Sequence, residues 1–218
     1  MSTAPSATPA ATPAATTPAT TADASYAARL SALATRGGAL RRVLDPQRPY
    51  RWNLRHLHPG FTLDVGCGIG RNLGHLDGNG VGVDHNAECV ALCRSSGFAA
   101  YSPEEFVASD AAQKGGFDSL LLAHVVEHLG ADETDQLVSR YLPYVRPGGR
   151  VIVITPQERG QASDVTHVRF VDESQVREMA QRLGLSVDSV RSFPLPRVAG
   201  RFFTYNETVA VLLTMATV

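Results

Sequence analysis

A glycine-rich turn between two short apolar runs constrains this chain more than any other feature. Residues 63–70 read LDVGCGIG, and a second apolar run over 80–84 ends in Asp84. Glycines that alternate after a strand let the backbone turn sharply and let a ligand approach the helix N–H groups that follow. An acid after the second strand can bind the hydroxyls of a ribose. The spacing therefore predicts a nucleotide-binding turn in an α/β sheet.

The spacing of the glycines argues against a dinucleotide. The dinucleotide fingerprint G-x-G-x-x-G places a pyrophosphate at a helix N-terminus, whereas the glycines here are Gly66, Gly68 and Gly70. Asp64 lies two residues before the first of them, where a carboxylate would face a cation rather than a pyrophosphate. S-adenosylmethionine fits this pattern, because it carries an amino group, a sulfonium and a ribose but no phosphate.

At these residues the chain resembles the class I S-adenosylmethionine-dependent methyltransferases that act on small molecules. The resemblance implies an α/β, Rossmann-like, doubly wound fold with a mostly parallel seven-stranded sheet and an antiparallel C-terminal hairpin. It also implies that the glycines shape the loop under the methionine part, that Asp64 meets the amino group directly or through water, and that Asp84 binds the ribose. The cofactor-binding residues expected from it are Asp64, Gly66, Cys67, Gly68, Gly70, Asp84, His85, Ser102 and Ala123.

Composition limits the chain to one folded domain. Residues 1–22 are nearly all Ala, Thr, Pro and Ser, and this segment is too poor in apolar bulk to pack. We expect a disordered tail over 1–22, a helical lid over 23–58 and a methyltransferase domain over 59–218. The 20 basic and 21 acidic residues give a net charge of -1, so the charge pattern favours a small-molecule acceptor over nucleic acid or an anionic membrane.

Neither a secretory signal nor a membrane span is predicted. The N-terminal segment has no basic region and no continuous apolar core, and no stretch approaches the ~20 apolar residues of a membrane helix. We therefore expect a cytoplasmic protein. The spacing of Cys67, Cys89 and Cys93 matches no zinc or redox motif, so reduced thiols are expected.

Hydrophobic patterning predicts strands and helices that alternate as far as Gly184. The run 117–123 is apolar almost throughout, as in a parallel strand buried on both faces. The last two strands follow each other without a helix, which predicts an antiparallel pair. The predicted strands are 61–65, 80–83, 98–101, 117–123, 150–155, 185–193 and 207–214. The predicted helices are 25–35, 39–44, 87–95, 104–108, 132–144 and 173–183.

The segment after the central strand carries a second set of chemical groups. Residues 124–128 read HVVEH, which matches the inverted zinc-protease motif H-x-x-E-H. We reject that assignment, because the motif needs both histidines on one helix face and here it begins at the end of a strand. His124 is the first residue out of the strand, so it is expected to face the methyl acceptor. Glu127 and His128 are expected to stabilise the turn.

A metal site is an alternative interpretation of the same segment. It resembles the methyltransferases of ubiquinone biosynthesis that methylate catechol oxygens, in which Glu-x-x-Glu-His holds a divalent cation. Here His124 replaces the first Glu, which weakens an oxygen site for Mg²⁺ because imidazole prefers softer ions. We therefore expect no metal, and the alternative would use Glu127 and His128.

His167 is a second candidate for a catalytic base beside His124. It lies in the segment 164–172 after the fifth predicted strand, at the edge of the sheet where doubly wound folds bind ligands. A similar His-x-x-Phe element occurs in many small-molecule methyltransferases. Methyl transfer to a hydroxyl needs alignment and removal of a proton, for which imidazole is well suited. The alternative for His167 is a loop histidine that packs or caps the next helix.

The acceptor pocket is the least defined part of the prediction. Tyr50, Arg51 and Trp52 could form a wall over the cofactor, although a lone Trp is more often a core residue. Arg197 and Arg201 could bind an anionic group, although a solvated loop is the simpler explanation. The predicted function is methyl transfer from S-adenosylmethionine to a small molecule, at an oxygen. The alternatives are a binding-only relative and a nicotinamide-dependent oxidoreductase.

Overall fold

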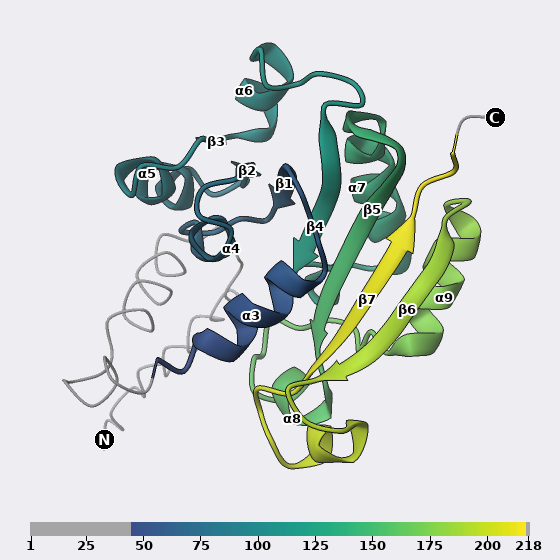
Figure 1. The fold of residues 1–218 in the computed structure, drawn as a ribbon. Coiled ribbons are helices and arrows are strands. Elements are labelled where there is room, and N and C mark those ends of the chain that lie inside the picture. The colour runs from purple at the N-terminus through teal and green to yellow at the C-terminus, as the bar shows by residue number, and fades with distance from the viewer. Residues whose placement is uncertain (1–44, 217–218) are drawn as a thin grey trace, which may run out of the picture.

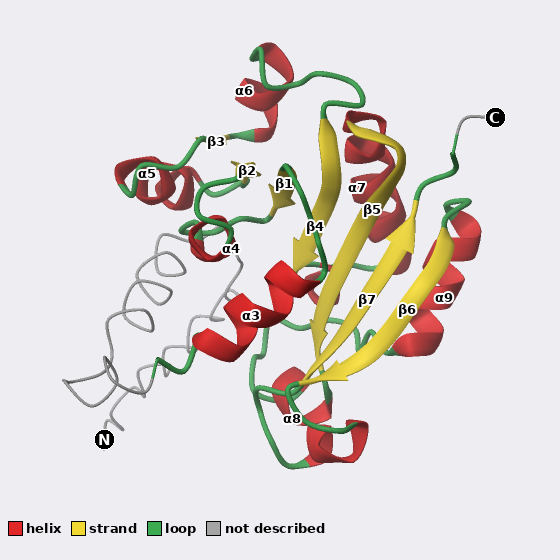
Figure 2. Ribbon diagram, in the orientation of Figure 1, coloured by secondary structure: helices red, strands yellow, loops and turns green. Residues whose placement is uncertain are grey.

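The computed structural model describes residues 45–216 of the chain. In this range a seven-stranded sheet runs in the order β3-β2-β1-β4-β5-β7-β6, with helices on both of its faces (Figures 1 and 2). The predicted tail over 1–22, the predicted helices 25–35 and 39–44, and most of the predicted lid lie outside the described residues. No helix in the described range is long and apolar enough to cross a membrane.

Strands and helices alternate along the described chain. The strands are β1 Thr62–Val65, β2 Gly80–Val83, β3 Ala100–Tyr101, β4 Phe117–Ala123, β5 Val145–Pro156, β6 Ser186–Phe193 and β7 Glu207–Leu213. The α-helices are α3 Arg48–His56, α4 Arg71–His75, α5 Ala87–Ser95, α6 Pro103–Ala108, α7 Ala131–Tyr141, α8 Glu158–Gln161 and α9 Glu173–Arg182. Short 3-10 helices are η1 Val126–His128, η2 Leu142–Tyr144 and η3 Arg197–Arg201.

The strand pairing confirms the predicted fold class. Strands β1 to β5 pair in parallel, whereas β7 is antiparallel to both of its neighbours, β5 and β6. The carboxyl ends of the parallel strands therefore meet at one edge of the sheet. That edge carries the glycine turn after β1, Asp84 after β2 and His124 after β4.

The central strand β4 is buried on both faces, as its apolar run predicts. Leu120 and Leu122 pack in the cluster that α6, α7 and α9 complete, whereas Leu121 packs with residues of α3 on the other face. All three leucines have no exposed surface. In Figure 1, α3 crosses in front of the sheet while α7 and α9 lie behind it.

Capping side chains explain where several helices begin. The side chain of Asn86 accepts hydrogen bonds from the first turn of α5, and Asp172 does the same for α9. Ser102 and Glu105 form a capping box at α6. Each such cap typically contributes ~1 kcal/mol, and because the signal is local these helix starts could be predicted from sequence.

Three elements differ from the sequence prediction by more than one residue at a boundary, and helices α4 and α8 were not predicted. The predicted helix 132–144 ends as an α-helix at Tyr141, and its last turn is the 3-10 helix η2, which contains Pro143. Strand β5 begins at Val145 rather than at 150, because Val145 pairs with Phe117 before a bulge in the register. Strand β3 is shorter than predicted, since Phe98 packs against the cluster of α4 and α5 instead of extending the strand.

Candidate active site

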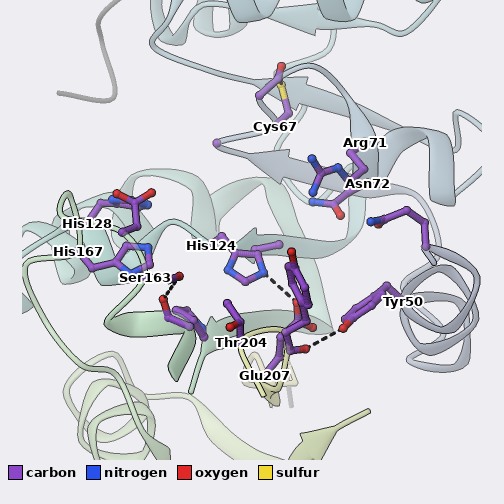
Figure 3. Close-up of a pocket in the computed structure, with 18 of the residues that line it drawn as sticks. Tyr50, Cys67, Arg71, Asn72, His124, His128, Ser163, His167, Thr204 and Glu207 are labelled. Atoms are coloured by element: carbon purple, nitrogen blue, oxygen red, sulfur yellow. Dashed lines mark hydrogen bonds and ion pairs between the residues drawn. The ribbon is translucent and has the colours of Figure 1, made fainter. Parts of the chain in front are cut away.

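A cavity of about 420 Å³ opens at the carboxyl edge of the parallel strands. Its walls come from the glycine turn, the end of β4, the segment after β5, the start of β7 and the beginning of α3. Figure 3 shows the arrangement, with His124 between the residues of the glycine turn and the pair formed by His128 and His167. The lining residues that matter most below are Tyr50, Asn72, His124, His128, His167 and Glu207.

The glycine turn requires glycine at two positions. Gly66 and Gly70 have φ angles of +76° and +83°, which residues with a side chain rarely adopt. A Cβ atom on Gly66 would clash with a methyl group of Val125, and one on Gly70 would lie 2.7 Å from the sulfur of Cys93. The turn therefore packs too tightly against its neighbours to accept a side chain at these two positions, and Gly66 and Gly68 also line the cavity.

Asp64 is an unpaired carboxyl group directly before the glycine turn. It has no exposed surface, and neither side-chain oxygen has a hydrogen-bond partner among the described residues. Burial, and to a lesser extent the charge of Asp84, raises the pKa of Asp64 to about 7; Asn72 limits the rise but does not reach hydrogen-bond geometry. A buried carboxylate without a partner is costly, so this position is suited to a cationic ligand group.

Asp84, in contrast, has protein donors. Its Oδ2 accepts the N–H of Gly68 at 2.8 Å and its Oδ1 accepts the N–H of Asn86 at 2.8 Å. Nδ1 of His85 lies 3.6 Å from Oδ1 of Asp84. Asp84 thus holds the glycine turn against the start of α5. Each carboxylate oxygen can accept a second hydrogen bond, and the ribose role of Asp84 stays a prediction.

The other residues of the expected cofactor set fall into two groups. Cys67 and Ala123 line the cavity. Gly70 is the residue that precedes α4, and Ser102 caps α6; neither is among the described residues that line the cavity. Their roles in cofactor binding, and that of His85, stay predictions.

His124 links two carboxylates from distant parts of the chain. Its Nδ1 lies 3.2 Å from Oε1 of Glu127, and its Nε2 lies 3.0 Å from Oε1 of Glu207. Partial desolvation of His124, whose side chain is still 45% exposed, lowers its pKa, but the two carboxylates outweigh it and raise the pKa to about 10. The ring is therefore protonated near neutral pH, and neither nitrogen has a lone pair that could accept a proton.

His128 and His167 form a pair of imidazoles at one end of the cavity. Their ring centroids lie 4.8 Å apart in an edge-to-face arrangement. Nδ1 of His128 lies 3.1 Å from the carbonyl oxygen of Thr166, and Nδ1 of His167 lies 3.0 Å from that of Gln161. Because a carbonyl can only accept, Nδ1 is the protonated nitrogen in both rings, which leaves Nε2 as the lone-pair atom of each neutral ring. Burial lowers the pKa of His128.

Glu127 holds the segment after β5 against the end of β4. Its side chain has no exposed surface, and its backbone carbonyl accepts the N–H groups of Val168 and Arg169 at 2.9 and 3.2 Å. The expected turn-stabilising contacts are thus present. Residues 126–128 form a three-residue 3-10 helix rather than the α-helix that a zinc-protease motif needs, which agrees with our rejection of that motif.

Of the three residues predicted as a wall, Tyr50 alone lines the described cavity. Its hydroxyl donates to the carbonyl oxygen of Tyr205 at 2.7 Å, and its ring meets Phe193 edge-on. Arg51 forms an ion pair with Asp45 instead. The expectation that the single Trp is a core residue is wrong, because Trp52 is 53% exposed and stacks on the ring of His56.

The basic loop before β7 does not contribute arginines to this cavity within the described residues. Arg197 makes two contacts of 2.6 Å with the carboxylate of Glu158, and Arg201 is exposed. Both arginines lie outside the cavity lining. The loop is therefore a solvated surface loop, which was the alternative to an anion-binding role for Arg197 and Arg201.

Sequence reasoning missed Asn72 and Glu207. Asn72 lies in the first turn of the helix that follows the glycine turn, a position that the motif itself could have indicated. Glu207 lies 83 residues after His124, and no local pattern marks it. It reaches the site because β7 pairs with β5 so that Glu207 lies opposite Pro156.

Comparison with known proteins agrees with this geometry. Residues 63–153 match a family model described as a methyltransferase domain, whereas no curated protein matches the chain. An S-adenosylmethionine-dependent methyltransferase from Archaeoglobus fulgidus has a TM-score of 0.63 at 17% identity, over 86% of this chain and 99% of that one. Magnesium protoporphyrin IX methyltransferase from Synechocystis with bound SAH has a TM-score of 0.60 at 14% identity, over 89% and 96%. An S-adenosylmethionine-dependent methyltransferase from Methanosarcina mazei has a TM-score of 0.55 at 14% identity, and the match covers 72% of this chain and 92% of that one.

The domain match, the sheet order and the glycine turn together define a Rossmann-like methyltransferase. Residues 63–153 form a methyltransferase domain, and the described chain has the fold of the class I S-adenosylmethionine-dependent methyltransferases, whose cofactor is S-adenosylmethionine. The glycine turn fits this cofactor, because Gly66 and Gly68 line the cavity. Asp64 lies directly before the turn as a buried carboxyl group without a partner, but it is not among the described residues that line the cavity.

Proposed function

We propose that this methyltransferase acts on an oxygen atom of a small-molecule acceptor bound in the cavity. The observation that carries the proposal is the pair of imidazoles, His128 and His167, whose Nδ1 atoms are occupied by carbonyl oxygens. A hydroxyl acceptor must lose its proton during transfer, and a neutral imidazole with a free Nε2 can take it. The cavity of about 420 Å³ includes the glycine turn assigned to the cofactor, so the space left favours an acceptor of small size.

We assign the cofactor-binding role to the glycine turn and its two acids. Gly66 and Gly68 would lie under the methionine part, Asp64 would pair with its amino group, and the free lone pairs of Asp84 would accept from the ribose hydroxyls. S-adenosylmethionine supplies a methyl group already activated on a sulfonium. The protein therefore has to align the acceptor, exclude water and manage one proton.

His167 is a better candidate for the base than His124. A base needs a free lone pair, and the pKa of about 10 leaves His124 protonated near neutral pH. His124 would instead act as a positioning residue that holds Glu127 and Glu207 at the cavity wall. We also assign α3, the described part of the predicted lid over 23–58, as the cover of the cavity in front of the domain over 59–218.

The test is a methyl-transfer assay with catechols, phenols and aliphatic alcohols, beside amines and thiols of similar size. We expect methylated oxygen, identified by mass spectrometry of the product. His167→Ala should slow transfer ~10²–10⁴-fold, the range for the loss of general base catalysis, with the affinity for S-adenosylmethionine unchanged. His56→Ala, an exposed histidine outside the cavity, is the matched control. Transfer to amines alone, or a wild-type rate in His167→Ala, would contradict the proposal.

A further inference from the structure

We propose that Glu127, His128 and His167 form a binding site for a divalent transition-metal ion of the Zn²⁺ type at one end of the cavity. One oxygen of Glu127 and one nitrogen of each imidazole all lie within 4.8 Å of one another. Two imidazoles and one carboxylate are the ligands of many catalytic zinc sites and of non-haem Fe(II) sites. Both histidines line the cavity, so further coordination positions would be open to a ligand there.

The first observation behind this site is an unpaired buried oxygen. The side chain of Glu127 has no exposed surface, and its Oε1 is bonded to His124. Its Oε2 has no hydrogen-bond partner among the described residues. A buried carboxylate oxygen without a donor is costly. A cation between Glu127 and the two imidazoles would provide the missing interaction.

The second observation is the orientation of the two imidazoles. Metal-bound histidines usually donate their other ring N–H to a carbonyl or carboxylate, which fixes the tautomer and turns the free nitrogen toward the ion. His128 and His167 both have this arrangement, with Thr166 and Gln161 as the carbonyl partners. The ligating carboxylate is supported in the same way, because His124 donates to Glu127. Each of the three side chains is thus held in place by a neighbouring group.

The ligand types select the class of ion. Mg²⁺ and Ca²⁺ prefer oxygen ligands, whereas imidazole nitrogen suits Zn²⁺, Fe²⁺, Co²⁺ and Ni²⁺. Bonds of about 2.0–2.1 Å to Zn²⁺ would place tetrahedral ligands about 3.4 Å apart. The three ligand atoms lie up to 4.8 Å apart without an ion, so their side chains would have to move closer together when the ion binds.

The site has a consequence for methyl transfer that rests on the proposed function. A hydroxyl oxygen bound to the ion would have a lower pKa and would lose its proton more easily. His167 would then be a ligand of the ion, and it would act as the base only in the metal-free enzyme. Metal binding itself does not depend on which acceptor the enzyme uses.

The experiment is a calorimetric titration of Zn²⁺ alone into the metal-stripped, full-length protein without an affinity tag. We expect one Zn²⁺ per chain and no detectable binding of Mg²⁺. His128→Ala, His167→Ala and Glu127→Gln should each weaken Zn²⁺ binding at least ~100-fold, because changes even to outer partners of metal ligands cost 10–100-fold. His56→Ala, an exposed histidine on α3, should bind Zn²⁺ as the wild type does.

A second measurement keeps the test decisive if a variant folds poorly. Co²⁺ added to the wild-type protein should give the visible absorption of an ion coordinated by imidazole, and Zn²⁺ should displace it. No Zn²⁺ binding by the wild type, or unchanged binding in the double variant of His128 and His167, would overturn the proposal.

S-adenosylmethionine binding is measured in the same metal-free samples, so that the metal site and the proposed function are tested separately. Intact cofactor binding without metal binding rejects the metal site alone, and Zn²⁺ binding without oxygen methylation rejects the proposed function alone.

Discussion

Asp64 and Asp84 lie on either side of the glycine turn, yet the surroundings of their carboxyl groups differ. Asp84 accepts two backbone N–H groups, whereas Asp64 has no donor among the described residues and burial raises its pKa to about 7. The native state therefore binds this proton more tightly than the unfolded chain does. The free energy of unfolding must fall as the pH rises from about 4 toward 7. A cationic ligand group bound at Asp64 would offset that loss of stability. The effect of Asp64 on the free energy of unfolding is therefore linked to its proposed role in cofactor binding.

Replacement of Asp64 by asparagine is expected to separate stability from binding. Without a buried charge, the ligand-free Asp64→Asn variant should melt several degrees above the wild type at about pH 8, since ~1 kcal/mol shifts Tm by 2–4 °C in a chain of this size. Its affinity for S-adenosylmethionine should fall at least ~10-fold, because a charge-assisted bond is lost. Calorimetry measures both quantities. Asp188→Asn, an exposed change on β6, is the control.

The wild-type affinity for S-adenosylmethionine should also depend on pH through Asp64. Binding should strengthen as the pH rises through about 7, where Asp64 loses its proton. It should weaken again above about 8, where an α-amino group loses its positive charge. Titrations across this range provide the measurement. If the affinity of the Asp64→Asn variant still rises with pH through about 7, a group other than Asp64 is responsible for the rise.

His124 should make the stability of the protein decline in alkaline solution. Its pKa in the folded protein is about 10, above the ordinary value of 6.5. The stabilisation by Glu127 and Glu207 is therefore fully present below pH 6.5 and is lost as the pH rises through about 10. Melting temperatures between these limits should decline less in His124→Gln than in the wild type. Equal slopes in the two proteins would contradict the assignment.

Among the elements, α3 links the sheet to the mouth of the cavity. Leu54 and Leu57 pack in the cluster on the front face of the sheet, and one turn earlier Tyr50 reaches the loop before β7. The hydrogen bond from Tyr50 goes to the backbone carbonyl of residue 205, so it fixes the loop backbone and does not depend on the side chain of Tyr205. The helix and this loop thus close the cavity together.

Removal of the Tyr50 hydroxyl is expected to loosen this closure. Tyr50→Phe keeps the ring contact with Phe193 and loses one hydrogen bond, which should cost about 0.5–1.5 kcal/mol of stability. Tyr205→Phe keeps the accepting carbonyl, so its melting temperature should equal that of the wild type. Differential scanning calorimetry on the three proteins makes the comparison. A Tyr50→Phe variant as stable as the wild type would show that α3 is held by its leucines alone.

The whole molecule should respond to its cofactor as one unit, because the glycine turn joins β1, β2 and α4 in the centre of the sheet. S-adenosylmethionine at 100 times its Kd should add about 2.7 kcal/mol of stability. In a chain of this size that corresponds to a rise in Tm of roughly 5–10 °C. Thermal shift measurements should show this rise with S-adenosylmethionine and none with NADH at the same concentration. An equal shift with NADH would contradict the cofactor assignment.

The architecture was largely predictable from sequence. Strands β2 and β4 and helix α5 have the predicted bounds, and the antiparallel C-terminal strands followed from the missing crossover. These features depend on signals within a few residues: apolar runs, glycines and caps such as Asn86. The glycine turn and its acids also lie within one short stretch, so local spacing is enough to infer the cofactor class.

Only the tertiary structure decided the charge and the partners of the histidines. His124 is held by Glu207 from 83 residues away, and His128 meets His167 across two separate loops. These contacts depend on how β7 pairs with β5 and how the segment after β5 folds back onto η1. A pKa depends on distances to such groups rather than on neighbours in the chain. The sequence by itself therefore determined the fold and the cofactor, whereas the protonation state of His124 and the cluster around Glu127 became visible only in three dimensions.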